Sequence, residues 1–325
     1  MFKKIARTAV FALSVAFSLA CTAAEAGTIK IGVEPWLGYG PLWVADQKGF
    51  YKQQGLDVEL VMFNTDQDMT AALASGKIDL IAAATNTTLI TINQGVPVVG
   101  VLVLDQSFNA DAILSGAKIS SIKDLKGRSV AYERGASSEL LIHYALKANG
   151  MTTADIKPVP MNASDAGLAL IAGRVDAAVT YEPYISTALK QGGSYKVLYT
   201  ASEKPGLISD LLIGTPDWVK AHQKEVAAVI RAWDSAVRFV RENPAEGGAI
   251  IAKAVGSSMD EFEPAFKGVR LFDGKENLEI LKGEFQDTVQ VIGDVMLTTS
   301  PGDVKRIVPA SELLSLDALK AAEVK

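Results

Sequence analysis

The sequence of 325 residues has few of the side chains that metal and redox sites use, with one cysteine and two histidines. So small a number excludes a disulfide framework and a thiolate zinc cluster. The sequence also lacks a large excess of charge of either sign, since it has 32 Lys and Arg and 37 Asp and Glu. A general nucleic-acid binder needs a basic face, which this balance does not supply. We therefore expect no metal, no cofactor and no nucleic acid.

The first 26 residues have the features of a secretory signal. Three Lys and Arg residues open the chain, and the apolar stretch at 9–20 is too short to span a bilayer. Ala24-Glu25-Ala26 places small residues at the two positions that a signal peptidase reads, so we expect cleavage before Gly27. Removing three basic residues and one acidic residue would leave a net charge of −7. No later apolar run reaches 18 residues, so we expect a soluble, exported protein.

The single cysteine, Cys21, lies inside this leader and raises the alternative of a lipid anchor. A lipobox usually has Leu three residues before its cysteine, whereas this sequence has Ser18. A suitable signal-peptidase site also follows closely. We therefore expect no lipid at Cys21 and no cysteine in the mature chain.

Strand and helix patterns alternate from residue 27 onward and then repeat. Strand-like runs at 29–33, 57–62 and 78–83 are separated by helical patterns at 41–54 and 67–75. This order predicts a parallel sheet with helices on both faces. The same pattern returns about a hundred residues later.

The repeat is visible in the residues themselves. The segment ALASGKID at 72–79 matches ALIAGRVD at 169–176, and the strand ending in Glu34 matches the strand ending in Glu133. We interpret the chain as two α/β lobes related by a pseudo-twofold axis.

We expect lobe I to comprise 27–110 plus 211–325, and lobe II to comprise 111–210. A strand-like run at 211–215 and a helical pattern at 219–240 follow lobe II, so lobe I would receive the helix-rich C-terminal third. The chain would cross between the lobes near 104–114 and 209–215. Two segments that join two α/β lobes are typical of hinge closure around a ligand.

Ligands of open α/β sheets bind at the carboxyl ends of the strands, where helix N-termini present free N–H groups. Carboxylates there suit ammonium or guanidinium, hydroxyls suit carboxylate or sulfonate oxygens, and aromatic rings suit an apolar or cationic group. Arg134 is the only basic residue in these loops, so we expect a zwitterionic or cationic small molecule. The candidate ligand-binding residues are Glu34, Trp36, Tyr39, Asn86, Thr87, Asp105, Glu133, Ser137, Ser138, Tyr181, Glu182 and Asp210.

Structural roles are the alternative for most of these side chains. The glutamates can interact with helix dipoles, the hydroxyls can be N-caps, and a hinge aspartate such as Asp105 or Asp111 can hold its own turn. His143 lies in a strongly apolar helical pattern, which favours a structural histidine over a catalytic one. We expect no catalytic residue.

Five segments resemble the nitrate/sulfonate/taurine family of ABC-transporter substrate-binding proteins. They are GVEPWLGYGPLWVA at 32–45, KGFYKQQGLDV at 48–58, ASGKID at 74–79, IKDLKGRSVA at 122–131 and GRVDAA at 173–178. The resemblance covers 29 to about 218. It implies a periplasmic-binding-protein type II fold, with two lobes that are each a doubly wound, mostly parallel sheet. It also implies a periplasmic location and, as partners, a small-molecule ligand, a membrane permease and its ATPase.

By the same resemblance, the loops around Trp36, 85–88, Ser137-Ser138 and Tyr181-Glu182 are the usual pocket positions. The excess of acidic residues departs from binders of nitrate or bicarbonate. We therefore predict a monomeric solute receptor, not an enzyme, for an amine- or guanidinium-bearing solute or an aminosulfonate such as taurine.

Two other functions stay open for the same fold. One is a thiamine-pyrimidine synthase, an enzyme class that relies on an active-site His and a Cys-rich iron motif. The other is a ligand-sensing receptor subunit, whose binding lobes would look identical to those of a transport receptor.

Overall fold

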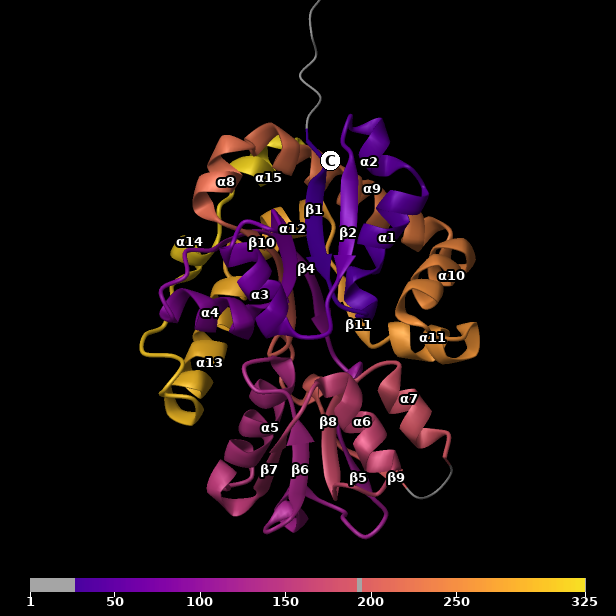
Figure 1. The fold of residues 1–325 in the computed structure, drawn as a ribbon, viewed down its shortest axis with the longest axis vertical. Helices are drawn as coiled ribbons and strands as arrows, with labels where there is room; N and C mark the ends of the chain where they lie inside the picture. Colours follow the sequence, from indigo (N-terminus) through magenta and orange to yellow (C-terminus); the bar gives the residue numbers. More distant parts are fainter. Residues whose placement is uncertain (1–26, 192–194, 325) are drawn as a thin grey trace, which may run out of the picture.

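The computed structural model describes residues 27–191 and 195–324. The predicted signal segment, with Cys21, lies outside the described residues. In the described part of the chain, no helix is both long enough and apolar enough to cross a membrane. The chain forms two lobes, one above the other in Figure 1, and each lobe is built on its own sheet.

The first sheet has six strands in the order β11-β4-β10-β3-β1-β2. Its strands are β1 (Ile29–Val33), β2 (Val58–Met62), β3 (Leu80–Ala84), β4 (Val99–Ser107), β10 (Ser209–Gly214) and β11 (Val269–Leu271). Strand β1 pairs in parallel with β2 and β3, and β10 runs antiparallel between β3 and β4. Four of the strands therefore run the same way, and the predicted mostly parallel sheet is confirmed.

Helices cover both faces of this sheet. The helices that precede the second lobe are α1 (Gly40–Gln47), α2 (Phe50–Gln53), α3 (Asp66–Ala74) and α4 (Thr85–Asn93), with a 3₁₀ turn at Leu37–Tyr39. Those that follow it are α8 (Pro216–Ala221), α9 (Gln223–Glu242), α10 (Pro244–Val255), α11 (Met259–Phe266), α12 (Gly274–Ile280), α13 (Glu284–Thr299), α14 (Ala310–Leu313) and α15 (Asp317–Ala321). The core includes Trp233 of α9, which is fully buried and donates its indole N–H to the Phe272 carbonyl at 2.8 Å.

The second sheet repeats this plan in the order β7-β6-β8-β5-β9. Its strands are β5 (Asp111–Gly116), β6 (Ser129–Tyr132), β7 (Lys157–Pro160), β8 (Ala177–Tyr181) and β9 (Tyr195–Thr200), and its helices are α5 (Ser137–Ala148), α6 (Ala163–Ile171) and α7 (Tyr184–Leu189). Strand β6 pairs in parallel with β7 and β8, as β1 does with β2 and β3. Strand β5 is the antiparallel strand here, in the place that β10 holds in the first sheet.

Repeat-related aspartates hold equivalent strands of the two sheets, β1 and β6, in the same way. Asp79 accepts a hydrogen bond from the Lys30 amide at 2.8 Å, at the start of β1. Asp176, the matching residue of the repeat, accepts from the Ser129 amide at 2.9 Å and from the Ser129 hydroxyl at 2.8 Å, at the start of β6. The sequence repeat thus corresponds to a repeat of contacts.

Two helical patterns in the sequence are interrupted in the structure. The pattern at 41–54 divides into α1 and α2, because Gly49 has a left-handed φ of 71° between them. The pattern at 219–240 belongs to α8 and α9, which are separated at His222. A single residue outside helical geometry breaks a helix without disturbing the apolar periodicity, so the sequence pattern looks continuous.

The chain passes between the lobes twice, and the second passage lies earlier than predicted. The first passage is between β4 and β5, inside the predicted 104–114. The second is 201–208, between β9 of the second sheet and β10 of the first, so the predicted 209–215 is wrong: it falls on β10. The predicted lobe limits, 27–110 plus 211–325 and 111–210, stay a prediction. A lobe is defined by the residues that move together as one rigid body.

Helix α13 makes a further connection between the lobes. It extends from the first lobe toward α5 of the second in Figure 1, and it packs against both α4 and α5. Lys147 of α5 donates to the Thr298 hydroxyl of α13 at 3.1 Å. The C-terminal third of the chain therefore also takes part in the contact between the lobes.

Candidate functional site

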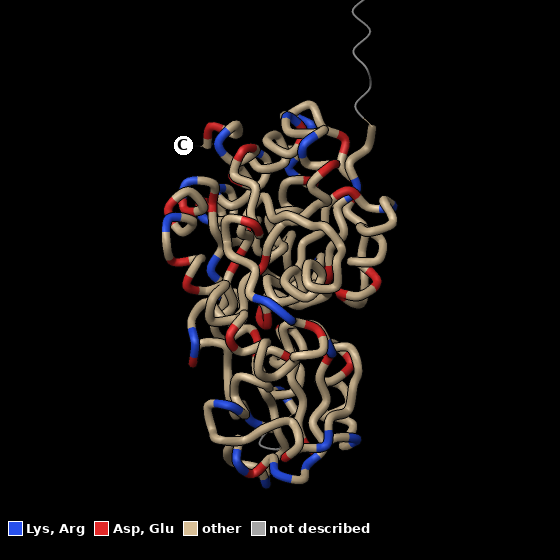
Figure 2. Tube along the Cα trace, turned by 90° about the vertical axis from the view of Figure 1, so that its left-hand side faces the viewer, with Lys and Arg blue, Asp and Glu red and all other residues tan. Residues whose placement is uncertain are grey.

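A small cavity of about 40 Å³ lies where the two sheets face each other. Its wall comprises Glu34, Trp36, Tyr39, Asp66, Ala84, Asp111, Ser137, Tyr181, Ile208 and Asp210. Strands β1, β2, β3, β6 and β8 contribute from their carboxyl ends or from the segments after them, and the antiparallel strands β5 and β10 contribute from their beginnings. This is the edge at which open α/β sheets bind ligands. Figure 2 shows Asp and Glu segments at this level between the lobes.

Aromatic rings from both lobes meet at the cavity. The Trp36 ring, from the first lobe, contacts the Tyr181 ring of the second lobe edge to face, with centroids 5.9 Å apart and an interplanar angle of 88°. Tyr181 in turn contacts Tyr184 at 5.4 Å. The Trp36–Tyr181 contact therefore exists only when the lobes are together.

Asp105 of β4 fixes the Trp36 ring from behind. It is fully buried, and its Oδ1 accepts the indole N–H of Trp36 at 3.0 Å. Its Oδ2 is buried without a hydrogen-bond partner among the described residues. Gly38 leaves the space for this carboxyl group, since a Cβ at that position would lie 2.2 Å from the Asp105 Cγ.

Four carboxyl groups share the wall, and no Lys or Arg side chain lies among the described wall residues. Burial, together with Asp66 and Glu133, raises the pKa of Glu34 well above its usual range, and burial raises the pKa of Asp66 to about 6. Burial raises the pKa of Asp111 to about 7. The pKa of Asp210 is also raised strongly, first by burial and then by Asp105 and the other acids. Burial thus favours the protonated form of these acids unless a cation neutralises them.

Two further acids stand directly behind this wall. Burial raises the pKa of Asp105 to about 8, although the Trp36 indole opposes the shift. Burial raises the pKa of Glu133 to about 7, and its Oε2 accepts the amide of Ala163 at 3.1 Å, at the start of α6. The acidic character of the site therefore extends beyond the residues in contact with the cavity.

The structure brings half of the predicted ligand-binding residues to the wall. The predicted residues that line the cavity are Glu34, Trp36, Tyr39, Ser137, Tyr181 and Asp210, and those that do not are Asn86, Thr87, Asp105, Glu133, Ser138 and Glu182. Asp66 was missed by the sequence prediction, although it follows β2 at the start of α3 and so occupies the same kind of strand-end position as Glu34.

The predicted residues outside the wall have structural partners. Both carboxylate oxygens of Glu182 accept from Ser186, the Oε2 from its amide and the Oε1 from its hydroxyl, each at 3.0 Å. Ser138 contacts the backbone of Glu133. Asn86 and Thr87 reach across to the carbonyl of Gly135 in the other lobe, at 3.4 and 3.1 Å.

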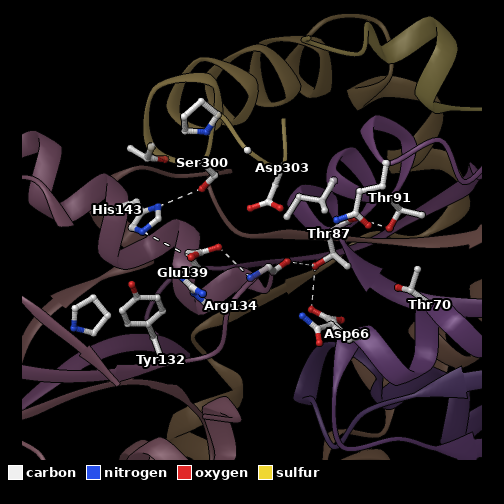
Figure 3. A pocket seen from close by; sticks show the side chains of 18 of the residues that line it. Asp66, Thr70, Thr87, Thr91, Tyr132, Arg134, Glu139, His143, Ser300 and Asp303 are labelled. Atoms are coloured by element: carbon white, nitrogen blue, oxygen red, sulfur yellow. Dashed lines mark hydrogen bonds and ion pairs between the residues drawn. The ribbon is translucent and has the colours of Figure 1, made fainter. Parts of the chain in front are cut away.

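A second, larger hollow of about 870 Å³ lies beside the small cavity and shares Asp66 with it (Figure 3). Its labelled side chains in Figure 3 are Asp66, Thr70, Thr87, Thr91, Tyr132, Arg134, Glu139, His143, Ser300 and Asp303. These come from α3, α4, the end of β6 with the loop after it, α5 and the segment after α13, and most of them lie on helices rather than at strand ends. We take the small cavity as the ligand site, because strand ends, aromatic rings and buried acids converge there.

His143 lies in the wall of the larger hollow rather than of the small cavity. Its Nδ1 is 3.4 Å from the Ser300 hydroxyl, its Nε2 is 3.8 Å from Glu139, and its ring contacts the Tyr132 ring edge to face. Burial lowers the pKa of His143 to about 4, so the imidazole is neutral at pH 7. Among the described residues, no group of three His, Cys, Asp or Glu side chains is placed to hold a metal ion.

Comparison with known proteins gives a family and a fold. A family model described as NMT1/THI5 like matches residues 37–247. A 4-amino-5-hydroxymethyl-2-methylpyrimidine phosphate synthase of Uromyces fabae is 31% identical over 209 residues, which are 59% of this chain and 60% of the relative. A putative aliphatic sulfonates-binding protein of Escherichia coli (strain K12) is 30% identical over 201 residues, 61% of this chain and 62% of the relative. The chain thus spans about six tenths of these relatives.

Solved structures with the same fold include periplasmic binding proteins. The periplasmic aliphatic sulphonate binding protein SsuA from Escherichia coli aligns with a TM-score of 0.72 at 22% identity, over 88% of this chain and 97% of that one. The periplasmic nitrate-binding protein NrtA from Synechocystis PCC 6803 aligns with a TM-score of 0.65 at 18% identity, over 89% and 91%. The predicted two-lobed periplasmic-binding-protein fold is confirmed.

Proposed function

The chain belongs to the NMT1/THI5-like family, and on that premise we propose that it is an exported solute receptor of an ABC importer. It captures a small organic cation between its lobes and delivers it to a membrane permease with its ATPase. The observation that carries this proposal is the cavity wall, which has four buried carboxyl groups and no described Lys or Arg.

The chemistry of the wall favours an ammonium or guanidinium group over a simple anion. A cation that enters would neutralise Glu34, Asp66 and Asp210 and could lie against the Trp36 ring. The Oε1 of Glu34 is a buried acceptor with no partner among the described residues, so a ligand donor would satisfy it. An aminosulfonate such as taurine would place its ammonium group here and would leave its sulfonate to Ser137 at the start of α5.

A thermal-shift screen of the refolded, ligand-stripped protein tests the solute class. The panel holds guanidine, amines, polyamines, betaines, amino acids, taurine, alkanesulfonates, nitrate and sulfate. A ligand at a hundred times its dissociation constant adds about 2.7 kcal/mol to the free energy of unfolding, which a melt resolves. We expect shifts only with compounds that bear an amine or guanidinium group. Shifts with nitrate, sulfate or alkanesulfonates alone would contradict the proposal.

Glu34→Gln tests the acidic wall directly. We expect the affinity for the cationic ligand found in the screen to fall about 10- to 150-fold, because a charge-assisted hydrogen bond contributes about 1.5–3 kcal/mol. Isothermal titration calorimetry measures it. The matched control is Glu182→Gln, which is expected to change the affinity less than twofold, because its carboxylate accepts from Ser186 outside the wall. Equal losses in both variants would overturn the assignment.

A synthase related to the Uromyces fabae enzyme is the second candidate, since the chain is similar to relatives of both kinds. Against it, the one cysteine of the sequence is Cys21, in the predicted leader. Neither histidine lines the small cavity, since His143 lies in the larger hollow and His222 stacks on Trp218. Product formation when the protein is incubated with candidate substrates would favour the synthase.

The partner of the receptor is the remaining part of the proposal. A permease and a signalling ectodomain would both dock on the closed lobes, and both fit the same binding site. A pull-down with the purified, ligand-loaded protein from solubilised membranes separates them: we expect permease subunits, and a sensor kinase or receptor in their place would indicate a sensing role.

A further inference from the structure

A set of hydrogen bonds joins the two lobes at one edge of the larger hollow (Figure 3). The hydroxyl oxygen of Thr87, in α4 of the first lobe, is 2.9 Å from the Oδ2 of Asp66 in the same lobe. It is also 3.1 Å from the carbonyl oxygen of Gly135 in the second lobe. The side-chain amide of Asn86 approaches the same carbonyl at 3.4 Å. Thr87 is therefore the shorter of the two side-chain links to this carbonyl.

The acceptor in the second lobe is held rigidly. Gly135 has a left-handed φ of 78°, which a residue with a side chain would adopt only with strain. Its amide donates to the Oε2 of Glu139 at 2.9 Å. The direction of the Gly135 carbonyl is thus fixed by its own backbone and by α5, so the bond to Thr87 forms or breaks with lobe movement.

The protonation state of Asp66 determines whether the Asp66–Thr87 and Thr87–Gly135 hydrogen bonds can both form. A threonine hydroxyl has one proton to donate, and a peptide carbonyl only accepts. If Asp66 is ionised, its carboxylate and the Gly135 carbonyl are both acceptors and compete for the one Thr87 proton. If Asp66 carries a proton, it donates that proton to Thr87 Oγ1, and Thr87 donates its own to Gly135. Both observed bonds then form at full strength.

We propose that Asp66, Thr87 and Gly135 form a proton-dependent clasp that holds the two lobes closed when Asp66 is protonated. When Asp66 loses its proton to solvent, Thr87 donates its proton to the carboxylate instead, and the Thr87–Gly135 hydrogen bond between the lobes is lost. Closure thereby takes up a proton, so acid favours the closed form by linkage. The clasp concerns the protein without its solute; in the proposed complex Asp66 would face the bound cation instead, so the test uses the ligand-free protein.

Other charged and titratable groups surround Asp66 and must be separated from it. Those that share the small cavity or interact with Asp66 through their charge are Glu34, Tyr39, Glu133 and Asp210, and those around the larger hollow are Arg134, Glu139, His143 and Asp303. Burial raises the pKa of Asp66 to about 6, which places its titration within an accessible pH range. Because several neighbours are themselves acidic, variants of Asp66 and Thr87 are needed to assign the effect.

Small-angle X-ray scattering of the refolded, ligand-stripped protein from pH 5 to pH 8 tests the clasp. We expect the radius of gyration of the wild type to increase as the pH rises through about 6. Thr87→Val, which keeps the shape and loses the hydroxyl, should stay expanded throughout. Asp66→Asn should stay compact throughout, because its amide donates to Thr87 at every pH. A thermal melt of each variant verifies that it is folded.

The matched control is Thr88→Val, which removes a buried hydroxyl of the same helix that donates to the Ala84 carbonyl within its own lobe. This variant should follow the wild-type curve. A wild-type radius that is constant with pH overturns the clasp. A pH-dependent radius that persists unchanged in Thr87→Val or in Asp66→Asn also overturns it, because the titration would then belong to one of the neighbouring groups.

Discussion

At the scale of single residues, the site gathers carboxyl groups where burial disfavours their charge. An isolated buried carboxylate is expensive, so such a group either takes a proton or finds a positive partner. Glu34, Asp66 and Asp210 lie in one cavity with no described Lys or Arg in its wall. Each raises the cost of ionising the others. A bound cation removes that cost, so affinity and selectivity would come from the same groups.

Gly38→Ala tests how tightly Asp105 and the Trp36 ring pack against Gly38. Because the added Cβ would lie 2.2 Å from the Asp105 Cγ, the buried carboxyl must move and its bond to the indole must distort. We expect a loss of about 1–3 kcal/mol in the free energy of unfolding, measured with urea, the scale of overpacking in a filled core.

Gly116→Ala is the control for that variant, since nothing lies within 4 Å of its added Cβ and its φ is outside the left-handed region. We expect a change below about 0.5 kcal/mol. If both alanine variants unfold at the same urea concentration as the wild type, Asp105 is free to move and does not fix Trp36.

The sequence predicted which residue types stand at the strand ends but not where each side chain turns. Glu34, Glu133 and Glu182 all follow strands and look alike in the sequence. In the structure only Glu34 lines the cavity, while Glu133 and Glu182 turn to the amides of Ala163 and Ser186 at helix starts. The direction of each glutamate side chain depends on whether a free backbone N–H lies near its carboxylate. The position of that N–H depends on tertiary structure, which the sequence pattern does not give.

At the scale of elements, the internal repeat carried most of the correct prediction. Strand β1 pairs with β2 and β3 as β6 pairs with β7 and β8, and the aspartates of the repeated motif hold equivalent strands. The short strand β11 was not predicted, since three residues give no alternation to detect. The break at Gly49 was missed because a single left-handed residue leaves the apolar periodicity intact.

Asp176→Ala tests the strand anchor of the second sheet. Hydrogen bonds from Ser129 lower the pKa of Asp176, because they favour the charged form, so the contribution is present above about pH 4 and is lost as the pH falls through the lowered value. We expect a loss of about 0.5–1.5 kcal/mol at pH 7 by urea unfolding, because solvent screens this side chain, which is 39% exposed, and a smaller loss at pH 3.

Asp46→Ala serves as the reference for that measurement, since Asp46 is exposed in α1 and makes no side-chain hydrogen bond with the described residues. It should change the free energy of unfolding by less than about 0.5 kcal/mol at both pH values. A loss for Asp176→Ala that is the same at pH 3 and pH 7 would show that packing, not charge, explains the anchor.

At the scale of the whole molecule, each lobe receives its antiparallel strand directly from the other. Strand β5 enters the second sheet straight after β4 of the first, and β10 enters the first sheet after β9 of the second. The acids Asp111 and Asp210 sit at the starts of these exchanged strands, so both passages between the lobes end in the cavity wall. The sequence predicted two passages, but not the packing of α13 on α5. An amphipathic pattern shows that a helix has an apolar face, but not which element packs against that face.

The buried acids make the stability of the ligand-free protein depend on pH in an unusual direction. Carboxyl groups whose pKa is raised on folding, such as Asp66 at about 6 and Asp111 at about 7, hold more protons in the folded chain than in the unfolded one. Stability therefore falls as the pH rises from the unfolded value near 4 toward the folded values. If the lobes open as the pH rises, the loss of stability between low and high pH becomes smaller, but stability still falls.

We expect the melting temperature of the ligand-stripped protein to be about 5 °C or more lower at pH 8 than at pH 5, since each kcal/mol moves it by about 2–4 °C. Differential scanning calorimetry measures the difference. Glu34→Gln should reduce it, because one buried ionisation is removed, whereas Asp165→Asn, an exposed change of the same charge, should leave it as in the wild type. A melting temperature that is constant or rises from pH 5 to pH 8 would mean that the carboxyl groups of the cavity remain ionised and solvated, and the case for a cation as their neutralising partner would fail with them.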